Sequence, residues 1–401
     1  MCIFFIIYEY ANVLQTAEFQ FYLPYSVFLK LQTQFFPEIL RYYQKFNQLS
    51  TKMIADLSRF DPNGVSVANN NLFGLPFTEE NAELIILPVP WEVTVSFKSG
   101  TARSPERLLH ASLQVDLFDS QFQNSWKKGV FMLPIDKKIL LKNDFLRKEN
   151  ELYLNFINSG DNIESNKFMK KTLKEVNAGC DELHQWVYEQ CKSRLDNGKK
   201  VGLLGGDHSV AYGLIKALSE RHEEFGILQI DAHCDLRKSF EGLNHSHGSI
   251  MYNVLNDFSN VKKLVQLGIR DYCESEWNYI CESDFRVVTY FEKEIKERQF
   301  EGQSWSQMAD EIIAQLPQQV YISYDIDGLD PKLCPHTGTP VPGGFEMEQL
   351  NFLFRKILNS GRTIIGFDLC ETGSSTDGWD ENVGARVIFK LCNLMLCENL
   401  S

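Results

Sequence analysis

Gly226-Ile227-Leu228-Gln229-Ile230, followed directly by Asp231-Ala232-His233-Cys234-Asp235, is the stretch of sequence that decides the fold. Its first half is a short, largely apolar run, which is typical of a strand buried inside a sheet. Its second half places an acid, an imidazole and an acid at alternate positions. Because alternate residues of an extended chain face the same side, Asp231, His233 and Asp235 are predicted to point in one direction.

Four more strand-like runs lie on either side of this stretch, with helix-length segments between them. The runs are residues 84–87, 201–204, 320–324 and 364–367, and the segments include 171–198, 211–222 and 346–360. A further helix is predicted to start at Ser104-Pro105-Glu106, where a capping serine precedes a proline and an acid in the first turn. Strands that alternate with helices predict an α/β fold with a mostly parallel sheet.

The ends of these strands carry the polar residues. The motifs that end them are Gly205-Gly-Asp-His-Ser209, Asp231–Asp235, Asp325–Pro331 and Asp368-Leu-Cys-Glu371. The carboxyl ends of parallel strands share one edge of the sheet, so the acids and histidines are predicted to converge there. The expected ligand set is His208, Asp231, His233, Asp235, Asp325 and Asp327. Four acids this close could not all stay ionised without cations, and such a set suits Mn²⁺, Fe²⁺, Ni²⁺ or Co²⁺.

A simpler interpretation exists for each motif alone. An Asp-x-Asp after a strand is more often a turn or a helix cap than a metal ligand, and Gly-Gly-Asp-His is also compatible with a tight turn. Asp207 and Asp330 are predicted to have such structural roles. Turns do not explain four such endings with interlocking spacing on one edge of the sheet, so the sequence favours a metal site, in which two ions could share bridging carboxylates.

Composition limits the partners. The chain has 401 residues, a formal net charge of −13 and ten cysteines without paired spacing. The acidic balance argues against a nucleic-acid or membrane partner, and the cysteines indicate a reducing, cytoplasmic compartment. We expect an N-terminal extension over residues 1–52, either an appended arm or translated upstream codons, then an arm over 53–83 and a catalytic domain over 84–401. Residues 137–170 are predicted to form a solvated insertion or a mobile excursion.

The combined motifs resemble those of the ureohydrolases, the family of arginase, agmatinase, guanidine hydrolase and formimidoylglutamase. The motifs that carry the resemblance are Gly205–Ser209, Asp231–Asp235, Ser323–Pro331 and Glu371, and the match runs from about Leu84 to the C-terminus. The resemblance implies a three-layer α/β/α sandwich and two divalent metal ions, Mn²⁺ or, as in some guanidine hydrolases, Ni²⁺. It also implies a homo-oligomer, a trimer or a hexamer.

The resemblance further implies a role for each residue. His208, Asp231, Asp235 and Asp325 would hold one ion, and His233, Asp231, Asp325 and Asp327 the other. A hydroxide between the ions would attack the guanidinium carbon. Asp235 would orient that hydroxide and protonate the leaving nitrogen, Glu371 would accept hydrogen bonds from the substrate, and Thr339 would contact it. His247 matches the proton-shuttling histidine, with His245 as the local competitor.

The substrate is less well defined by the sequence. Arginases place an asparagine two residues after the Asp235 position, where this chain has Arg237. This cation disfavours a substrate with a cationic tail, unless it turns to solvent. Residues 88–97 and 379–386 look more like agmatinase-type members. Trp91, Phe97 and Trp379 would then line a cation-binding pocket, or else pack in the core.

From these features we expect hydrolysis of agmatine or guanidine to release urea. The alternatives are formimidoylglutamase or arginase activity, deacylation at a related metal centre, and a metal-binding scaffold without catalysis.

Overall fold

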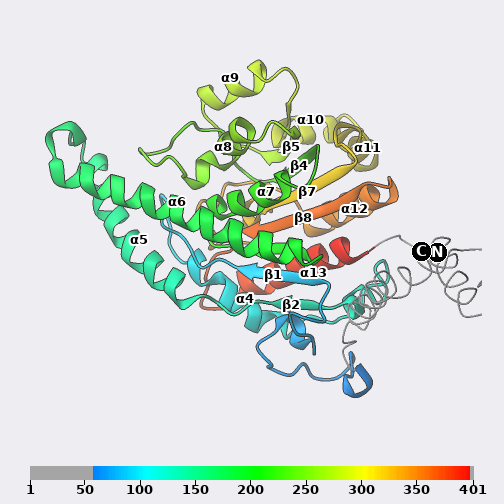
Figure 1. Cartoon of the computed structure of the whole chain (residues 1–401). Helices are drawn as coiled ribbons and strands as arrows, with labels where there is room; N and C mark the ends of the chain where they lie inside the picture. Colours follow the sequence, from blue (N-terminus) through cyan, green and yellow to red (C-terminus); the bar gives the residue numbers. More distant parts are fainter. Residues whose placement is uncertain (1–56, 398–401) are drawn as a thin grey trace, which may run out of the picture. The chain divides into compact units, whose positions relative to one another are not determined.

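The protein is built on one parallel sheet, which is described by a computed structural model for residues 57–397 (Figure 1). The sheet has eight strands in the order β2-β1-β3-β8-β7-β4-β5-β6, and every neighbouring pair is parallel. The strands are β1 (Leu84–Pro88), β2 (Val130–Met132), β3 (Lys200–Leu204), β4 (Phe225–Ile230), β5 (Val261–Ile269), β6 (Val287–Phe291), β7 (Gln319–Asp325) and β8 (Thr363–Cys370).

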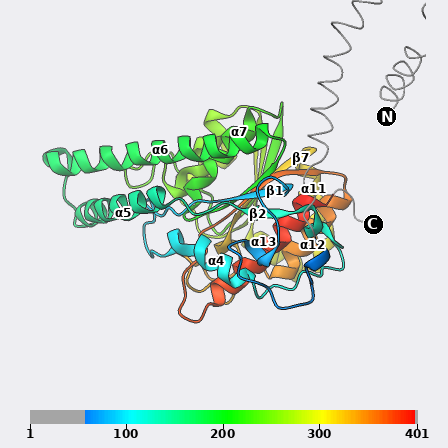
Figure 2. The ribbon, with the colours of Figure 1, turned by 60° about the horizontal axis from the view of Figure 1, so that its bottom comes forward.

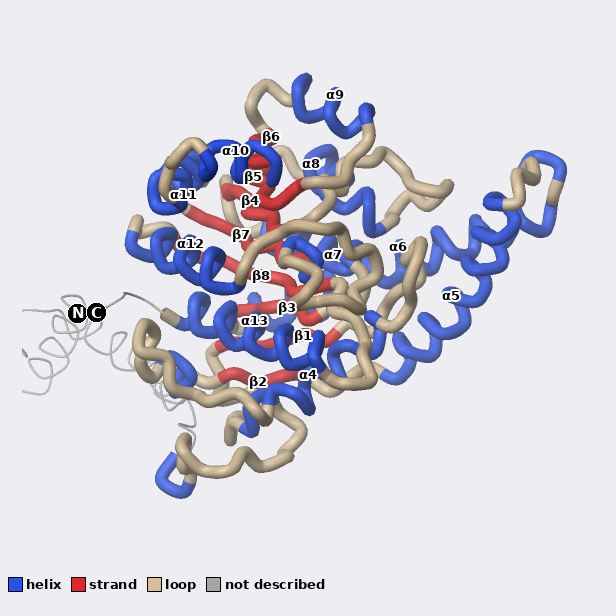
Figure 3. Tube along the Cα trace, turned by 180° about the vertical axis from the view of Figure 1, so that it is seen from behind, coloured by secondary structure: helices blue, strands red, loops and turns tan. Residues whose placement is uncertain are grey.

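Helices cover both faces of the sheet, which confirms the three-layer α/β/α sandwich (Figures 2 and 3). One layer contains α6 (Lys167–Asp196), α7 (Ala211–Ser219) and α8 (Ile250–Asp257). The other contains α4 (Ser104–Ser112), α11 (Trp305–Gln315), α12 (Met347–Asn359) and α13 (Trp379–Leu396). The remaining helices are α5 (Lys137–Asn158), α9 (Glu274–Glu282) and α10 (Glu292–Phe300). Among residues 57–397, no helix is both long enough and apolar enough to cross a membrane.

The five predicted strands are all present, whereas three others escaped prediction. β2 is only three residues long. β5 begins with Val261-Lys262-Lys263, whose lysines interrupt the apolar pattern, and the three central residues of β6 are only half-buried. Weak apolar patterning is expected where a strand lies at or near the edge of a sheet. The strands that carry the ligand motifs lie in the middle, where burial on both faces makes the pattern strong.

The interpretation of residues 137–170 as a solvated insertion or a mobile excursion was only partly right, because most of these residues are exposed or half-buried but the segment is helical. Residues 137–158 form α5, whose first turn is capped by the Asp136 carboxylate through the N–H groups of Lys138 (2.7 Å) and Ile139 (3.2 Å). A short 3₁₀ turn joins it to α6, and the two helices form a hairpin that extends beyond the sheet (Figure 1). The polar sequence was misleading because α5 buries polar side chains, including Asn143 and Asn150.

Local contacts bring α4 and the loop after β1 against the end of β3. Ser104 does not cap α4 as predicted; its hydroxyl donates to the Gly205 carbonyl (2.8 Å), while Pro105 lies in the first turn as expected. A Cβ atom on Gly206 would lie only 1.8 Å from the Trp91 carbonyl oxygen, so this position requires glycine. The Gly205-Gly206 pair therefore lets two loops pack closely beside His208.

The domain division predicted from the sequence stays a prediction. The extension over residues 1–52 lies outside the described residues, and so do the first residues of the arm over 53–83.

Candidate metal centre

Three strands in the middle of the sheet, β3, β4 and β7, bring the predicted ligands together. His208 follows β3, Asp231 directly follows β4, and Asp325 is the last residue of β7. Two groups of side chains have ligand atoms that all lie within 4.8 Å of one another: one is His208, Asp231 and Asp235, and the other is Asp231, His233 and Asp327. The convergence predicted from the strand ends is therefore present, and Asp231 belongs to both groups.

His208 is the centre of the first group. Its Nδ1 atom lies 2.9 Å from Asp235 Oδ2, 3.2 Å from Asp231 Oδ2 and 3.5 Å from Asp325 Oδ2. Despite these distances, the nitrogen makes no hydrogen bond of acceptable geometry, and the imidazole is fully buried. A buried nitrogen that faces three carboxylates without a hydrogen bond is the arrangement expected of lone pairs that converge on a cation.

His233 is the centre of the second group. Its Nδ1 atom lies 3.1 Å from Asp327 Oδ2 and 3.5 Å from Asp231 Oδ1. The two oxygens of Asp231 thus face different histidines, which fits the expected bridging role. Asp325 faces His208 but is a member of neither group, so its role as a bridging ligand stays a prediction.

Burial makes this cluster electrostatically costly without cations. Burial, together with the charges of Asp327 and Asp231, raises the pKa of Asp325 well above its usual range. Burial and the charge of Asp231 raise the pKa of Asp235 to about 7. Burial favours neutral imidazoles, but the nearby aspartates outweigh it and raise the pKa values of His208 and His233. Two divalent cations in place of these protons would satisfy the same carboxylates, so the residues present fit such ions.

A buried hydrogen-bond network fixes the His208 ring from behind. Its Nε2 atom lies 2.8 Å from Ser323 Oγ, and the Ser323 hydroxyl donates to Asp368 Oδ2 (2.9 Å). The Tyr321 hydroxyl donates to the same carboxylate oxygen (2.7 Å). Since Ser323 donates its proton to Asp368, Nε2 carries the imidazole proton and Nδ1 is free to act as a ligand. The sequence analysis missed this network, although Tyr321 and Ser323 are two residues apart and therefore share one face of β7.

Two site residues have backbone conformations that non-glycine residues rarely adopt. The φ angles of Asp235 and Glu371 are 55° and 59°, respectively. The extended chain assumed for Asp231–Asp235 therefore ends before Asp235, whose left-handed backbone turns the carboxylate back to His208. Strained backbone of this kind concentrates at functional sites, where the surrounding structure holds it.

Glu371 and His247 form a pair beside the ligands. Glu371 Oε1 accepts a hydrogen bond from the His208 backbone N–H (3.0 Å) and lies 3.2 Å from His247 Nδ1. Burial favours the neutral His247 ring, but the hydrogen bond and the charge of Glu371 outweigh it and raise the pKa of His247 to about 9. His247 is consequently protonated at neutral pH and able to donate a proton.

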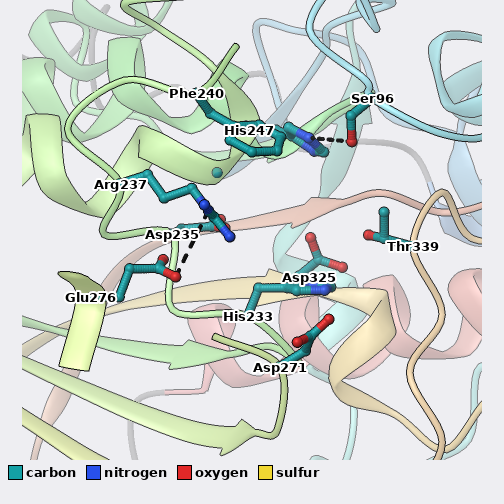
Figure 4. A pocket seen from close by; sticks show the side chains of 11 residues that line it. Ser96, His233, Asp235, Arg237, Phe240, His247, Asp271, Glu276, Asp325 and Thr339 are labelled. Carbon is teal, nitrogen blue, oxygen red and sulfur yellow. Dashed lines mark hydrogen bonds and ion pairs between the residues drawn. The ribbon is translucent and has the colours of Figure 1, made fainter. Parts of the chain in front are cut away.

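A small cavity opens onto the cluster (Figure 4). Its volume is about 190 Å³, and it is lined by Ser96, His233, Asp235, Arg237, Phe240, His247, Gly248, Asp271, Glu276, Asp325 and Thr339. The cavity is smaller than the ~300–1,000 Å³ typical of sites for drug-sized ligands, which suits a small substrate. Thr339 lies at its edge, with its hydroxyl 3.4 Å from Asp327 Oδ2.

The aromatic residues proposed to line this cavity do not do so. Trp91 is fully buried in the core, so its predicted role as a substrate contact is not supported by its position. Phe97 is 68% exposed, and Trp379 is 44% exposed with its indole N–H donating to the Lys332 carbonyl (2.9 Å). The aromatic residue that sequence reasoning missed is Phe240, which carries no distinguishing motif.

Arg237 does not turn away to solvent. It lines the cavity, where its guanidinium carbon lies 4.6 Å from the centre of the Phe240 ring and its Nε atom 3.8 Å from Glu276 Oε2 (Figure 4). Glu276 is buried and accepts hydrogen bonds from the N–H groups of Leu236 (3.1 Å) and Cys273 (3.0 Å). The positive charge inferred at this position is therefore present at the cavity, with the buried Glu276 carboxylate as an ion-pair partner.

The remaining predictions concern residues near the site. Asp207 is buried and accepts hydrogen bonds from the N–H (3.1 Å) and the hydroxyl (2.8 Å) of Thr94, as expected for a structural role. His245 does not line the cavity; its Nε2 atom lies 3.0 Å from Asp181 Oδ1 on α6. Of the two candidate shuttle histidines, only His247 faces the cavity and Glu371.

Known proteins are similar to this chain in sequence and in fold. The Arginase family matches residues 82–393. The N(1)-aminopropylagmatine ureohydrolase of Thermus thermophilus is 29% identical over 315 residues, 79% of this chain and 91% of that protein. The guanidinobutyrase of Pseudomonas aeruginosa is 29% identical over 339 residues, with coverage of 80% and 90%. The agmatine ureohydrolase of Thermoplasma volcanium has a similar fold, with a TM-score of 0.59 at 19% identity over 84% of this chain and 96% of that one. The chain therefore belongs to the arginase family and is a ureohydrolase.

Proposed function

We propose that this chain hydrolyses the guanidino C–N bond of a small substrate, agmatine or guanidine, and releases urea. The observation that carries the proposal is a buried His/Asp cluster that opens onto a small cavity with His247 at its wall. When bound to the cluster, two divalent ions lower the pKa of water and so supply hydroxide near neutral pH. Mn²⁺ is the metal we propose, with Ni²⁺ as the alternative.

Different residues around the cluster are proposed to bind the substrate and to transfer protons. Glu371 Oε1 is occupied by His208 N–H and His247, whereas Oε2 faces Gly338, which has no side chain to block it. That oxygen is proposed to accept charge-assisted hydrogen bonds from the guanidinium N–H groups. Asp235 lines the cavity and is proposed to orient the attacking oxygen and to protonate the leaving nitrogen.

The relatives support the reaction class more strongly than the substrate. One is named for aminopropylagmatine and another for guanidinobutyrate hydrolysis, and both align over most of their length. The size of the cavity supports a small guanidino compound. Arginase activity is less favoured because Arg237 stands where arginases have an asparagine.

The test is product release by the purified full chain after reconstitution with Mn²⁺ or Ni²⁺. Urea is measured with guanidine, agmatine, arginine and guanidinobutyrate, and formamide with formimidoylglutamate. We expect urea from agmatine or guanidine, and its loss in the Asp235→Ala variant. Asp310→Ala is the matched control, because the Asp310 carboxylate is exposed on α11 and belongs neither to the ligand groups nor to the cavity lining.

Any other outcome would replace the proposed activity with one of the alternatives. Urea from arginine alone would assign arginase activity, and formamide alone would assign formimidoylglutamase activity. No product from any substrate, in protein that holds two metal ions, would favour a scaffold without catalysis.

A further inference from the structure

Asp380 carries a buried carboxylate that the proposed chemistry does not use. It lies in the first turn of α13 and is fully buried. Its Oδ2 atom accepts a hydrogen bond from the His336 backbone N–H (2.9 Å), and its Oδ1 atom lies 2.8 Å from His336 Nδ1. Because an ionised carboxylate only accepts hydrogen bonds, Nδ1 carries the imidazole proton in this pair. An acid in the first turn commonly serves its own helix, whereas both oxygens of Asp380 bind a loop residue from elsewhere in the chain.

His336 stands at the start of a segment that reaches the cavity. The hydroxyl of Thr337 donates to the Glu371 carbonyl (2.7 Å). A Cβ atom on Gly338 would lie 3.4 Å from Glu371 Oε2, the oxygen proposed to bind the guanidinium. Thr339 lines the cavity (Figure 4). The three residues after His336 therefore lie beside Glu371 and the cavity, so the position of His336 determines theirs.

The next residue of α13 holds the loop that follows Glu371. Glu381 Oε1 accepts from the Ser375 backbone N–H (3.1 Å), and its Oε2 accepts from the Ser375 hydroxyl (2.8 Å). A Cβ atom on Gly373, in the same loop, would lie 2.1 Å from the His336 carbonyl oxygen, so the two loops are in direct contact. Glu371 itself has a φ angle of 59°, and backbone strained in this way persists only where its surroundings hold it. The first turn of α13 thus anchors both of the segments that hold Glu371.

We propose that Asp380 is a positioning residue for the hydrolysis, which acts through His336 to hold residues 337–339 against Glu371. This inference rests on the proposed function and adds to it a pair that belongs neither to the ligand groups nor to the cavity lining. A shift of about 1 Å in the groups that orient a substrate can lower its rate of reaction about 100-fold. Loss of the Asp380–His336 pair should therefore lower kcat. The affinity for Mn²⁺ should not change, because neither residue is a predicted ligand.

The experiment replaces His336 while the Asp380 carboxylate stays in place. His336→Ala deletes the ring, His336→Asn places an amide nitrogen on Cγ as Nδ1 is, and His336→Gln places it one bond further along the side chain. All three variants keep the backbone N–H that Asp380 also binds, so the fold should be retained. Urea release from agmatine or guanidine is measured with the Mn²⁺-loaded full chain. We expect kcat to fall roughly 10–100-fold in His336→Ala and His336→Gln, and His336→Asn to recover most of the wild-type rate.

Asp380→Asn tests the carboxylate itself. Its amide keeps one acceptor oxygen but turns a donor towards one of the two His336 N–H groups, so we expect a similar fall in kcat. If Asp380 acts through His336, the double variant Asp380→Asn/His336→Ala should be no slower than Asp380→Asn alone. The matched control is His110→Ala, which removes an exposed histidine of α4 outside the cavity and should leave kcat unchanged.

Bound Mn²⁺, thermal unfolding and kcat are measured on the same samples, which separates this inference from the proposed function. Wild-type kcat in His336→Ala would overturn the inference alone, even with a lower unfolding temperature, because the pair would then have only a structural role. A loss of activity that His336→Asn does not restore, or that follows a loss of bound Mn²⁺, would overturn it as well. No urea from any substrate with the wild-type chain would overturn the proposed function and this inference with it.

Discussion

Single residues behind the metal ligands determine how well those ligands are presented. His208 contacts three aspartates through Nδ1, and its other nitrogen is held by Ser323, which is hydrogen-bonded to Asp368. In this arrangement the carboxylate orients the imidazole through a hydroxyl and selects its tautomer. Ser323 and Asp368 are therefore as much a part of the site as the ligands.

Removal of the Ser323 hydroxyl is predicted to weaken metal binding without loss of the fold. Loss of such a partner typically lowers metal affinity by about 10–100-fold, so we expect this change in the Mn²⁺ dissociation constant of Ser323→Ala by isothermal titration calorimetry. Ser360→Ala, at the other end of the sheet near β8, is the matched control. Wild-type affinity in Ser323→Ala would contradict the proposed role of the network.

His247 gives a prediction on pH dependence. The Glu371 hydrogen bond and charge outweigh the effect of burial and raise the pKa of His247 to about 9. A proton donor works only while protonated, so its contribution should be present at pH 7 and be lost as the pH rises through about 9. His247→Gln should lower kcat roughly 100-fold, as is common for loss of an acid–base group, and remove that alkaline decline. A kcat–pH profile with an unchanged alkaline limb in His247→Gln would assign the decline to another group.

At the scale of elements, α5 braces the loop that rims the cavity. Asn143 Oδ1 accepts from Glu92 N–H (2.7 Å), Asn150 Nδ2 donates to the Val93 carbonyl (2.8 Å), and Arg147 donates to the Val95 carbonyl. These side chains are buried and lie three or four residues apart, so they share one face of the helix. The loop that they hold carries Ser96 into the cavity.

Disruption of this brace should affect both stability and substrate binding. Asn150→Ala leaves the buried Val93 carbonyl without its donor, which typically costs about 1–3 kcal/mol in the free energy of unfolding. We expect this loss in urea denaturation, together with a higher KM. Asn155→Ala, an exposed position on the same helix, should change neither. A destabilised Asn150→Ala variant with wild-type KM would restrict α5 to a structural role.

The elements also explain what the sequence could predict. The central strands are buried on both faces, so their apolar runs could be recognised in the sequence. Each of these runs is followed by acids and histidines, which identified the candidate ligands. β2, β5 and β6 lack a clear apolar run, so the sequence did not predict them. α5 was misjudged because its buried face bonds to loop backbone through asparagine and arginine. The ion pair of Arg237 with Glu276 could not be predicted, because Glu276 is distant in sequence and carries no motif.

At the scale of the whole molecule, the ligands tie distant parts of the chain together. They come from β3, β4 and β7, and β8 lies between two of these strands. Ions that bind only the folded chain stabilise it by mass action, by about 2.7 kcal/mol for each site at a hundredfold excess over the dissociation constant. Thermal unfolding should therefore shift upward by several degrees with Mn²⁺ and return with a chelator. Asp231→Asn, which alters the residue shared by both ligand groups, should show little of this shift.

The most direct test measures the number of bound metal ions and the enzymatic activity on the same sample. Metal-free full chain is titrated with Mn²⁺, and urea release from agmatine is measured against the ions bound per chain. The two ligand groups that share Asp231 predict that activity reaches its plateau at two ions per chain. Full activity with one ion per chain, or no activity with two bound, would contradict the account.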